Sequence, residues 1–112
     1  MYQIVAEVEP PTEVKLALYR IAQEALNNMA KHSNASHLEV RYLALPQGLE
    51  LAILDDGRGF DLDSRSPGQM GLSIMRERAE HIGATLTIRS APGEGAEVRV
   101  EWRPRGKNKL HE

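Results

Sequence analysis

Apolar residues recur at helical spacing in two stretches of the chain. The first stretch spans about 14–32, and its apolar stripe consists of Val14, Leu18, Ile21, Ala22, Ala25 and Met29. Thr12 before it suits an N-cap, and Glu13 lies in the first turn, where the helix dipole favours an acid. The second stretch spans about 70–82, with an apolar face of Leu72, Met75, Ala79 and Ile82. Because Gly83 is placed to end it, the pattern predicts two amphipathic helices.

Five shorter stretches have the alternating or β-branched pattern that is typical of strands. They are residues 2–8, 38–45, 49–54, 85–88 and 98–102. Glycine-containing turns at 46–48 and 91–95 join them in pairs. The order β-α-β-β-α-β-β predicts an α+β fold, a two-layer α/β sandwich. In it, helices cover one face of a mixed, mostly antiparallel sheet.

The composition excludes several classes of protein but does not indicate a function. The chain has 112 residues, 41% hydrophobic and 27% charged, which suits one compact domain with a core. Its net charge of −2 gives no sign of a nucleic-acid or anionic membrane surface. The lack of cysteine excludes disulfides, thiolate metal sites and a cysteine nucleophile. No apolar run approaches the roughly 20 residues that span a bilayer, and no signal peptide is visible.

The most informative stretch is 53–60, Ile-Leu-Asp-Asp-Gly-Arg-Gly-Phe, where a predicted buried strand ends in two carboxylates and two glycines. Gly57 and Gly59 allow a sharp turn and a close backbone approach to a ligand. The carboxylate of Asp55 can accept a hydrogen bond from an amino group on a planar ring. Taken alone, the stretch also fits a hairpin, because Asp-Gly is a strong turn signal.

A polar group lies at the margin of the first helix's apolar stripe. Glu24 and Asn28 are four residues apart, and Lys31 follows almost one turn later on the same side. Mg²⁺ prefers oxygen ligands and takes few of them from protein, so Asn28 can supply one. Glu24 can accept a proton, and Lys31 can pair with a phosphate. The alternative is an ordinary solvated helix face, because charged helix margins are common.

Two further glycine clusters follow, at 67–73 and 93–96. The first lies at the start of the second helix, where unpaired backbone N–H groups and the helix dipole favour an anion such as a phosphate. Each cluster also has a simpler interpretation, since the first fits a helix entry and the second a hairpin turn.

In this order and spacing, the stretches resemble the ATP-binding fold shared by gyrase, the Hsp90 chaperone, sensor histidine kinases and the mismatch-repair ATPases. The closest resemblance is to the catalytic domain of sensor histidine kinases of the nitrate-sensor type. The segment 18–32 resembles that group's asparagine box, and 55–60 its first glycine box, Asp-x-Gly-x-Gly. The segments 71–79 and 90–95 resemble the second and last glycine boxes. The resemblance covers roughly residues 1–103, which we expect to form the domain, with 104–112 a flexible basic tail.

The resemblance implies how an adenine base would be held. Asp55 would accept a hydrogen bond from the adenine amino group, and the backbone at Gly57 and Gly59 would wrap the base. Phe60 and Leu72, which lie in the two glycine-box segments, complete the residues expected to contact the nucleotide there.

The resemblance also implies how the phosphates would be held. Asn28 would ligate Mg²⁺ between them, and Lys31 and His32 would approach them. Gly68 and Gly71 would flank the hinge of a lid over the nucleotide. Glu24 stands where the gyrase-like members carry a general base. Because a target imidazole is itself the nucleophile in a histidine kinase, this carboxylate would orient or polarise rather than deprotonate.

The implied function is transfer of the γ-phosphoryl group of Mg-ATP to a histidine on a separate dimerisation domain of a two-component sensor kinase. Its expected partners are ATP, that histidine-bearing domain and a response regulator, in the cytoplasm, with no nucleic acid and no membrane contact by this domain. The chain's four histidines, His32, His37, His81 and His111, do not lie in a dimerisation-helix context. His81, at the end of a predicted helix, fits a capping or surface residue instead.

The sequence departs from the family pattern at two places. The lid at 61–69 is short, and Ala96 stands where a threonine is frequent.

Two alternative functions are also compatible with the sequence. One alternative is a serine kinase of the anti-sigma-factor type, although the asparagine box and the Arg-Glu-Arg sequence at 76–78 favour the histidine kinase. The other is an interaction domain that has lost ATP binding, against which Asn28, Asp55 and the glycines argue.

Overall fold

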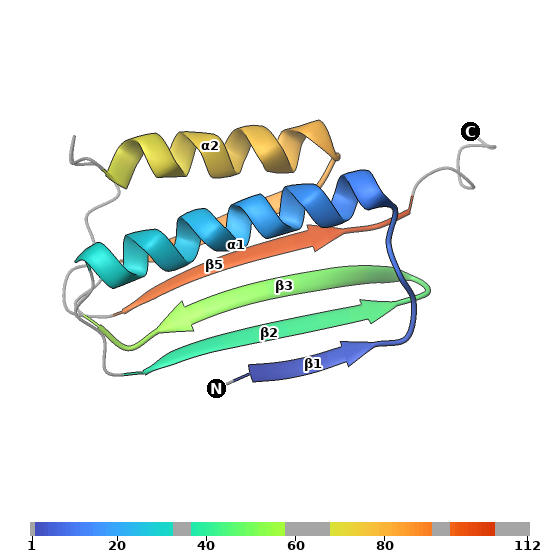
Figure 1. Ribbon diagram of the computed structural model, residues 1–112, viewed down its shortest axis with the longest axis horizontal. Coiled ribbons are helices and arrows are strands. Elements are labelled where there is room, and N and C mark those ends of the chain that lie inside the picture. Colours follow the sequence, from blue (N-terminus) through green and yellow to red (C-terminus); the bar gives the residue numbers. More distant parts are fainter. Residues whose placement is uncertain (1, 33–36, 58–67, 91–94, 105–112) are drawn as a thin grey trace.

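The computed structural model describes residues 2–32, 37–57, 68–90 and 95–104, and the side chains within these ranges except those of 31–32 and 68–71 (Figure 1). Its helices and strands are, in chain order, β1 (Tyr2–Ala6), α1 (Thr12–His32), β2 (Leu38–Leu45), β3 (Gly48–Asp55), α2 (Gly68–His81), β4 (Thr85–Ser90) and β5 (Ala96–Trp102). This order confirms the predicted sequence of elements.

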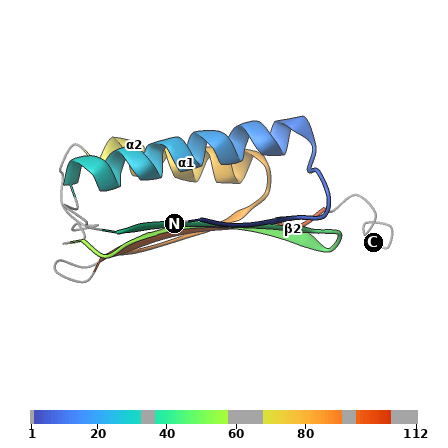
Figure 2. The same ribbon diagram turned by 60° about the horizontal axis from the view of Figure 1, so that its bottom comes forward.

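The described strands form one sheet in the order β1-β2-β3-β5-β4. Strand β1 runs parallel to β2, and the other neighbouring pairs are antiparallel. Figure 2 shows both described helices on the same side of the sheet. The predicted α+β sandwich, with a mixed and mostly antiparallel sheet covered on one face, is therefore confirmed.

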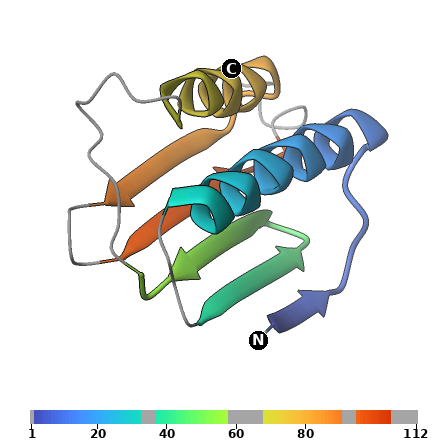
Figure 3. The same ribbon diagram turned by 60° about the vertical axis from the view of Figure 1, so that its left-hand side comes forward.

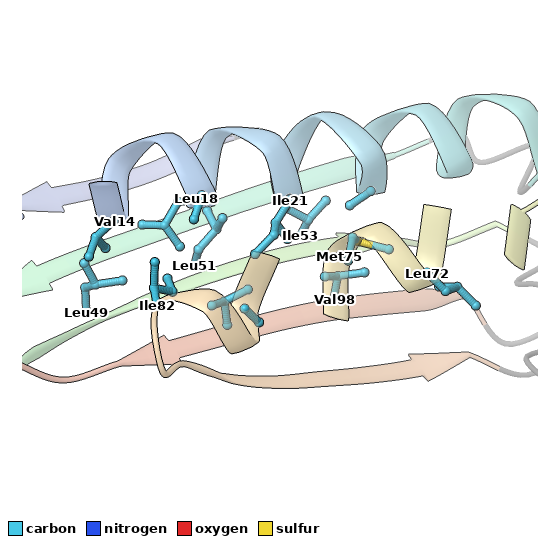
Figure 4. Packing of buried hydrophobic residues seen from close by; sticks show 14 of the residues in the cluster. Val14, Leu18, Ile21, Leu49, Leu51, Ile53, Leu72, Met75, Ile82 and Val98 are labelled. Atoms are coloured by element: carbon cyan, nitrogen blue, oxygen red, sulfur yellow. The ribbon is translucent and has the colours of Figure 1, made fainter. Parts of the chain in front are cut away.

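The core lies between this helical layer and the central strands (Figure 4). Every apolar position predicted on the two helix stripes is buried or packs against the buried cluster. The largest fully buried side chains are Ile21, Met29, Ile53, Met75, Val98 and Val100. Burying a side chain of this size contributes about 1.5–3 kcal/mol, so these contacts fix where the helices lie on the sheet.

The C-terminal end of α2 is held by specific contacts. Gly83 has a φ of 70°, and the N–H of Ala84 donates to the carbonyl of Ala79 at 2.9 Å, so the predicted glycine C-cap is confirmed. His81 Nε2 lies 2.9 Å from Glu13 Oε2 on α1, and both side chains are exposed, as expected for a surface histidine. Helix α2 thus lies beside α1, and its last turn is next to the first turn of α1.

The opposite face of the sheet carries charged side chains, which explains why no described helix covers it. Arg99 pairs with Glu97 on its own strand and with Glu50 on β3, and Arg41 pairs with Glu39 on β2. The hydrogen bond that Arg99 donates to Glu97, with a further one to Glu50, raises the pKa of the Arg99 guanidinium above its usual value. These pairs satisfy the polar groups without a second helical layer.

Strand β1 forms one edge of the sheet, beyond α1 (Figure 3). It pairs only with β2 among the described strands, and all five of its residues are exposed. Tyr2 is 74% exposed and Ile4 64%, although both lie on the side of the sheet that carries the helices. Helix α1 packs on β3 and β5 rather than over this edge.

Several boundaries differ from the predicted ones by one or two residues. The first strand ends at Ala6 rather than at residue 8, because the chain turns toward α1 after the N–H of Glu7 has donated to Ala44. Helix α2 begins at Gly68, so the predicted lid segment 61–69 is wrong at its last two positions. The N–H groups of a first turn need no intrahelical partner, which makes glycine and polar residues acceptable there. Of the predicted tail, 104–112, residues 105–112 lie outside the described residues.

The two hairpin strands β4 and β5 are each two residues longer than predicted, and the extension depends on a glycine. Ser90 and Ala96 pair at the end of the hairpin. Gly95, just before β5, has a φ of 82°, and a Cβ there would lie 2.5 Å from the carbonyl oxygen of Asp55. Only glycine combines this left-handed backbone with such a close approach of the two chains.

We therefore predict that Gly95→Ala destabilises the domain by about 1–3 kcal/mol, because the substitution adds backbone strain and a clash with β3. Urea denaturation measures this loss. Gly83→Ala is the matched control, since Gly83 also has a positive φ but is exposed. Equal losses in the two variants would show that the approach to Asp55 carries no cost of its own.

Candidate functional site

A row of four side chains on neighbouring strands defines one end of the sheet. Asp55 is opposite Leu38 on β2 and Ala96 on β5, and Ala96 is opposite Ser90 on β4. Because side chains alternate along a strand, Asp55 shares a face with Ile53, which is fully buried under the helices. The last residue of β3 therefore places a carboxylate on the helix-covered face, at the end of an apolar row.

One oxygen of the Asp55 carboxylate has a partner in the described part of the protein and the other has none. Oδ1 accepts a hydrogen bond from the N–H of Gly57 at 2.8 Å. Oδ2 is buried and has no hydrogen-bond partner in the described structure. Buried polar atoms nearly always have a partner, so an unpaired oxygen at this position suits a donor from a ligand. The hydrogen bond to Gly57 fixes the orientation of the carboxylate.

A pocket of about 380 Å³ opens at this end of the strands. Its lining comes from β3, β4, β5 and the glycine just before β5, and consists of Leu54, Asp55, Arg89, Ser90, Gly95, Ala96 and Glu97. This volume lies within the range of small-molecule sites in proteins. The hydroxyl of Ser90 donates to the carbonyl of Gly95 at 3.4 Å, which holds the two strands of the hairpin together beside Asp55.

Helix α1 contributes a second group of polar residues. Asn28 is 8% exposed and is the one buried polar side chain in the described part of the chain. Glu24, one turn earlier, is half-buried. Glu24 also lies about three turns after Glu13, which pairs with His81 of α2, so Glu24 is on the side of α1 that faces α2. Both predicted residues thus lie at the margin between the helices and the core.

These groups gather at one end of the molecule. Figure 1 shows that the end of α1, the start of α2, the end of β3 and the start of β5 all lie at that end. Lys31 and His32 form the last turn of α1, and Gly68 and Gly71 lie in the first turn of α2. The side chains of 31–32 lie outside the described part.

Of the other predicted contact residues, the structure describes Gly57 and Leu72. Leu72 is 7% exposed and packs in the hydrophobic core, so it anchors the first turns of α2 to the core. Gly59 and Phe60 lie outside the described residues. Gly57 is described, and its N–H is held by Asp55.

Two residues of the site were not singled out from the sequence. Asp56 bonds to His37 across the sheet, and Gly95 lies against the backbone of Asp55. The Gly-Glu-Gly sequence at 93–95 signals a turn, but nothing in it indicates which strand lies nearby. The partners His37 and Asp56 are 19 residues apart, and only the register of β2 and β3 brings them together.

The described residues contain no group of three or more histidine, aspartate or glutamate side chains placed to hold a metal ion. Neither described helix is long and apolar enough to cross a membrane. The predicted residues that carry side-chain oxygen atoms toward this end are Asn28, Glu24 and Asp55.

Comparison with known proteins gives consistent similarities. A family model described as "Histidine kinase-, DNA gyrase B-, and HSP90-like ATPase" matches residues 13–106. The chain is 38% identical over 90 residues to "Signal transduction histidine-protein kinase/phosphatase DegS" of Brevibacillus brevis, covering 80% of this chain and 23% of the relative. It is 38% identical over 97 residues to "Sensor protein VraS" of Staphylococcus epidermidis, covering 87% of this chain and 28% of the relative.

Among solved structures, the blue-light activated histidine kinase of Erythrobacter litoralis EL346 superimposes with a TM-score of 0.74 at 25% identity. The match covers 97% of this chain and 36% of that chain. The chain therefore spans about a quarter of the length of these two curated relatives, and about a third of that solved kinase.

Proposed function

The chain belongs to the family of histidine kinase-, DNA gyrase B- and HSP90-like ATPases, and from this we propose that it is the ATP-binding catalytic domain of a two-component sensor kinase. The observation that carries the proposal is the unpaired, buried Oδ2 of Asp55 at the end of β3. We place the domain at residues 1–103 and its action in the cytoplasm. The rest of such a kinase would carry the phosphoacceptor histidine, and a response regulator would then receive the phosphoryl group.

Base recognition would depend on Asp55. Its Oδ2 would accept the hydrogen bond of the adenine 6-amino group, while Oδ1 stays with the N–H of Gly57. A guanine presents a carbonyl at the same position, which the carboxylate would repel. The backbone at Gly57 and Gly59, with the ring of Phe60, would enclose the base. This arrangement explains why an acid rather than an amide ends β3.

Phosphate binding would depend on the facing ends of the two helices. The amide oxygen of Asn28 is a suitable ligand for a Mg²⁺ ion that takes its other ligands from phosphates and water. Lys31 and His32 would approach the phosphates from the last turn of α1. The backbone at Gly68 and Gly71 would offer N–H groups to them from the first turn of α2, where the helix dipole favours an anion. A Mg²⁺ ion held there would neutralise charge that develops on the transferring group.

Phosphoryl transfer requires little covalent chemistry from the protein, because catalysis is mainly positioning and electrostatic stabilisation. A histidine acceptor has a nucleophilic nitrogen of its own and needs no strong base. The half-buried carboxylate of Glu24 would therefore orient or polarise the acceptor. It lies one turn from Asn28, which would hold both groups near the same phosphate.

The acceptor would come from another domain. His37 and His81 are both exposed, and each pairs with a carboxylate, Asp56 for the first and Glu13 for the second. Neither carboxylate belongs to the proposed phosphate site. The side chains of His32 and His111 lie outside the described residues.

The serine kinase alternative shares the fold and is less favoured, because the relatives named above are sensor or histidine kinases. The two functions differ in the chemistry of the product. A phosphohistidine is labile to acid and stable to base, whereas a phosphoserine is stable to acid.

We predict that the domain prefers ATP to GTP and that Asp55→Asn removes the preference. Loss of the charged hydrogen bond should weaken ATP binding by about 1.5–3 kcal/mol. Calorimetric titration measures the affinities. Glu39→Gln is the matched control, because Glu39 is a carboxylate on β2 that pairs with Arg41 on the surface. Equal affinity of the wild type for the two nucleotides would contradict this account of Asp55.

We predict that Asn28→Ala abolishes the Mg²⁺ dependence of ATP binding while the domain stays folded. Titration with and without Mg²⁺, together with a circular dichroism spectrum, measures both properties. Asn27→Ala is the control, because Asn27 is the exposed neighbour on the same helix and should change neither. Wild-type Mg-ATP affinity in Asn28→Ala would exclude this residue as the ligand, and unfolding would assign it a structural role.

We predict that the 112-residue chain binds ATP without phosphorylating itself and that a histidine-bearing dimerisation domain restores transfer. Incubation with γ-labelled ATP, followed by acid and base treatment, measures this. Acid-labile label on the isolated chain would reveal an acceptor among its own histidines. Acid-stable label on a serine of an added protein would support the serine kinase instead.

A further inference from the structure

Two consecutive aspartates at the end of β3 point to different parts of the protein. The side chain of Asp55 is directed to the helix-covered face of the sheet. The carboxylate of Asp56 instead contacts His37, the residue just before β2. Its Oδ1 accepts the backbone N–H of His37 at 2.9 Å, and its Oδ2 lies 3.1 Å from His37 Nδ1. In return, the backbone N–H of Asp56 donates to the carbonyl of His37 at 3.3 Å.

This arrangement replaces one bond of the β ladder with a side-chain bond. His37 and Asp56 are the next pair in register after Leu38 and Asp55. In a regular antiparallel pair of this kind, the N–H of His37 would donate to the backbone carbonyl of Asp56. The side-chain oxygen accepts that N–H instead, which allows β3 to bend at Gly57 while β2 stays anchored. The bend is needed because the N–H of Gly57 donates back to Asp55 Oδ1.

We propose that Asp56 is a positioning residue that sets the orientation of the Asp55 carboxylate toward the base of a bound nucleotide. The inference rests on the proposed function of Asp55. Asp56 touches no substrate in this account. It fixes where the backbone leaves the sheet, and so fixes the Gly57 N–H that orients Asp55.

The bond from the backbone N–H, rather than the contact between the two side chains, carries this role. The side chain of His37 is 86% exposed and that of Asp56 is 48% exposed. Exposed ion pairs contribute little to stability. By contrast, the bond from the N–H of His37 holds the end of the ladder beside Asp55. On the other side of Asp55, Gly95 lies against its carbonyl oxygen, so the residue is held from both neighbouring strands.

The experiment compares ATP with the triphosphate of unsubstituted purine riboside, which lacks the 6-amino donor. In Asp56→Ala, ATP affinity should fall about tenfold, as expected for a misplaced charged hydrogen bond, while affinity for the purine analogue changes less than about twofold. The amide proton of Gly57 should shift in the NMR spectrum of the same variant, because its bond to Asp55 is disturbed. Calorimetry and circular dichroism on the full chain give the affinities and the folded state.

Three further variants separate the possible causes. Asp56→Asn keeps an oxygen for the N–H of His37 and should retain the preference for ATP. His37→Ala keeps the backbone N–H and should behave like the wild type. Glu39→Ala removes a carboxylate that pairs with Arg41 on β2, and should change neither affinity.

Several results would overturn the proposal. They are an unchanged ATP preference in Asp56→Ala, an equal loss for both nucleotides in that variant, or a lost preference in folded Asp56→Asn. The last result keeps the test decisive even if Asp56→Ala fails to fold. If Asp55→Asn abolishes the preference and Asp56→Ala does not, only this inference fails. If the wild type binds neither nucleotide, the proposed function fails as well.

Discussion

The structure depends on one apolar contact, in which the two helices pack together on the central strands β3 and β5. Ile21 and Met75 from the helices meet Ile53 and Val98 from the strands, and all four are almost completely buried. This contact fixes the helices along the strands, so that the end of α1, the start of α2 and the end of β3 lie together. The polar residues of the candidate site lie at the end where these rows of apolar side chains stop.

That end of the core holds polar atoms that an ordinary core would exclude. Asn28 is buried, and one oxygen of Asp55 is buried without a partner in the described structure. An unpaired polar atom of this kind costs about 1–3 kcal/mol. A ligand that supplies the missing donor would recover this cost on binding, so the buried oxygen would contribute to the affinity of the site. The neighbouring strands β2 and β5 hold Asp55 in place independently of a ligand.

The sequence predicts the fold well because the signals that determine it are local. The stripes of the two helices, the cap at Gly83 and the order of strands all follow from spacing within single elements, and the structure confirms them. The grouping of Asn28 and Asp55 at one end also follows from family motifs. What the sequence did not reveal depends on register between strands. The bond from His37 to Asp56 and the approach of Gly95 to Asp55 join segments that are 19 and 40 residues apart, and no pattern within either segment encodes them.

The exposed edge strand has a consequence for how the domain opens. Strand β1 contributes little to the core, and among the described strands only β2 is paired with it. Its amides should therefore exchange with solvent at a low free energy of local opening, well before those of β3 and β5. Because α1 is held by β3, β5 and α2 rather than by β1, such opening should leave the end of β3 that carries Asp55 undisturbed. The domain thus combines a labile border with a rigid centre, and fluctuations at one need not reach the other.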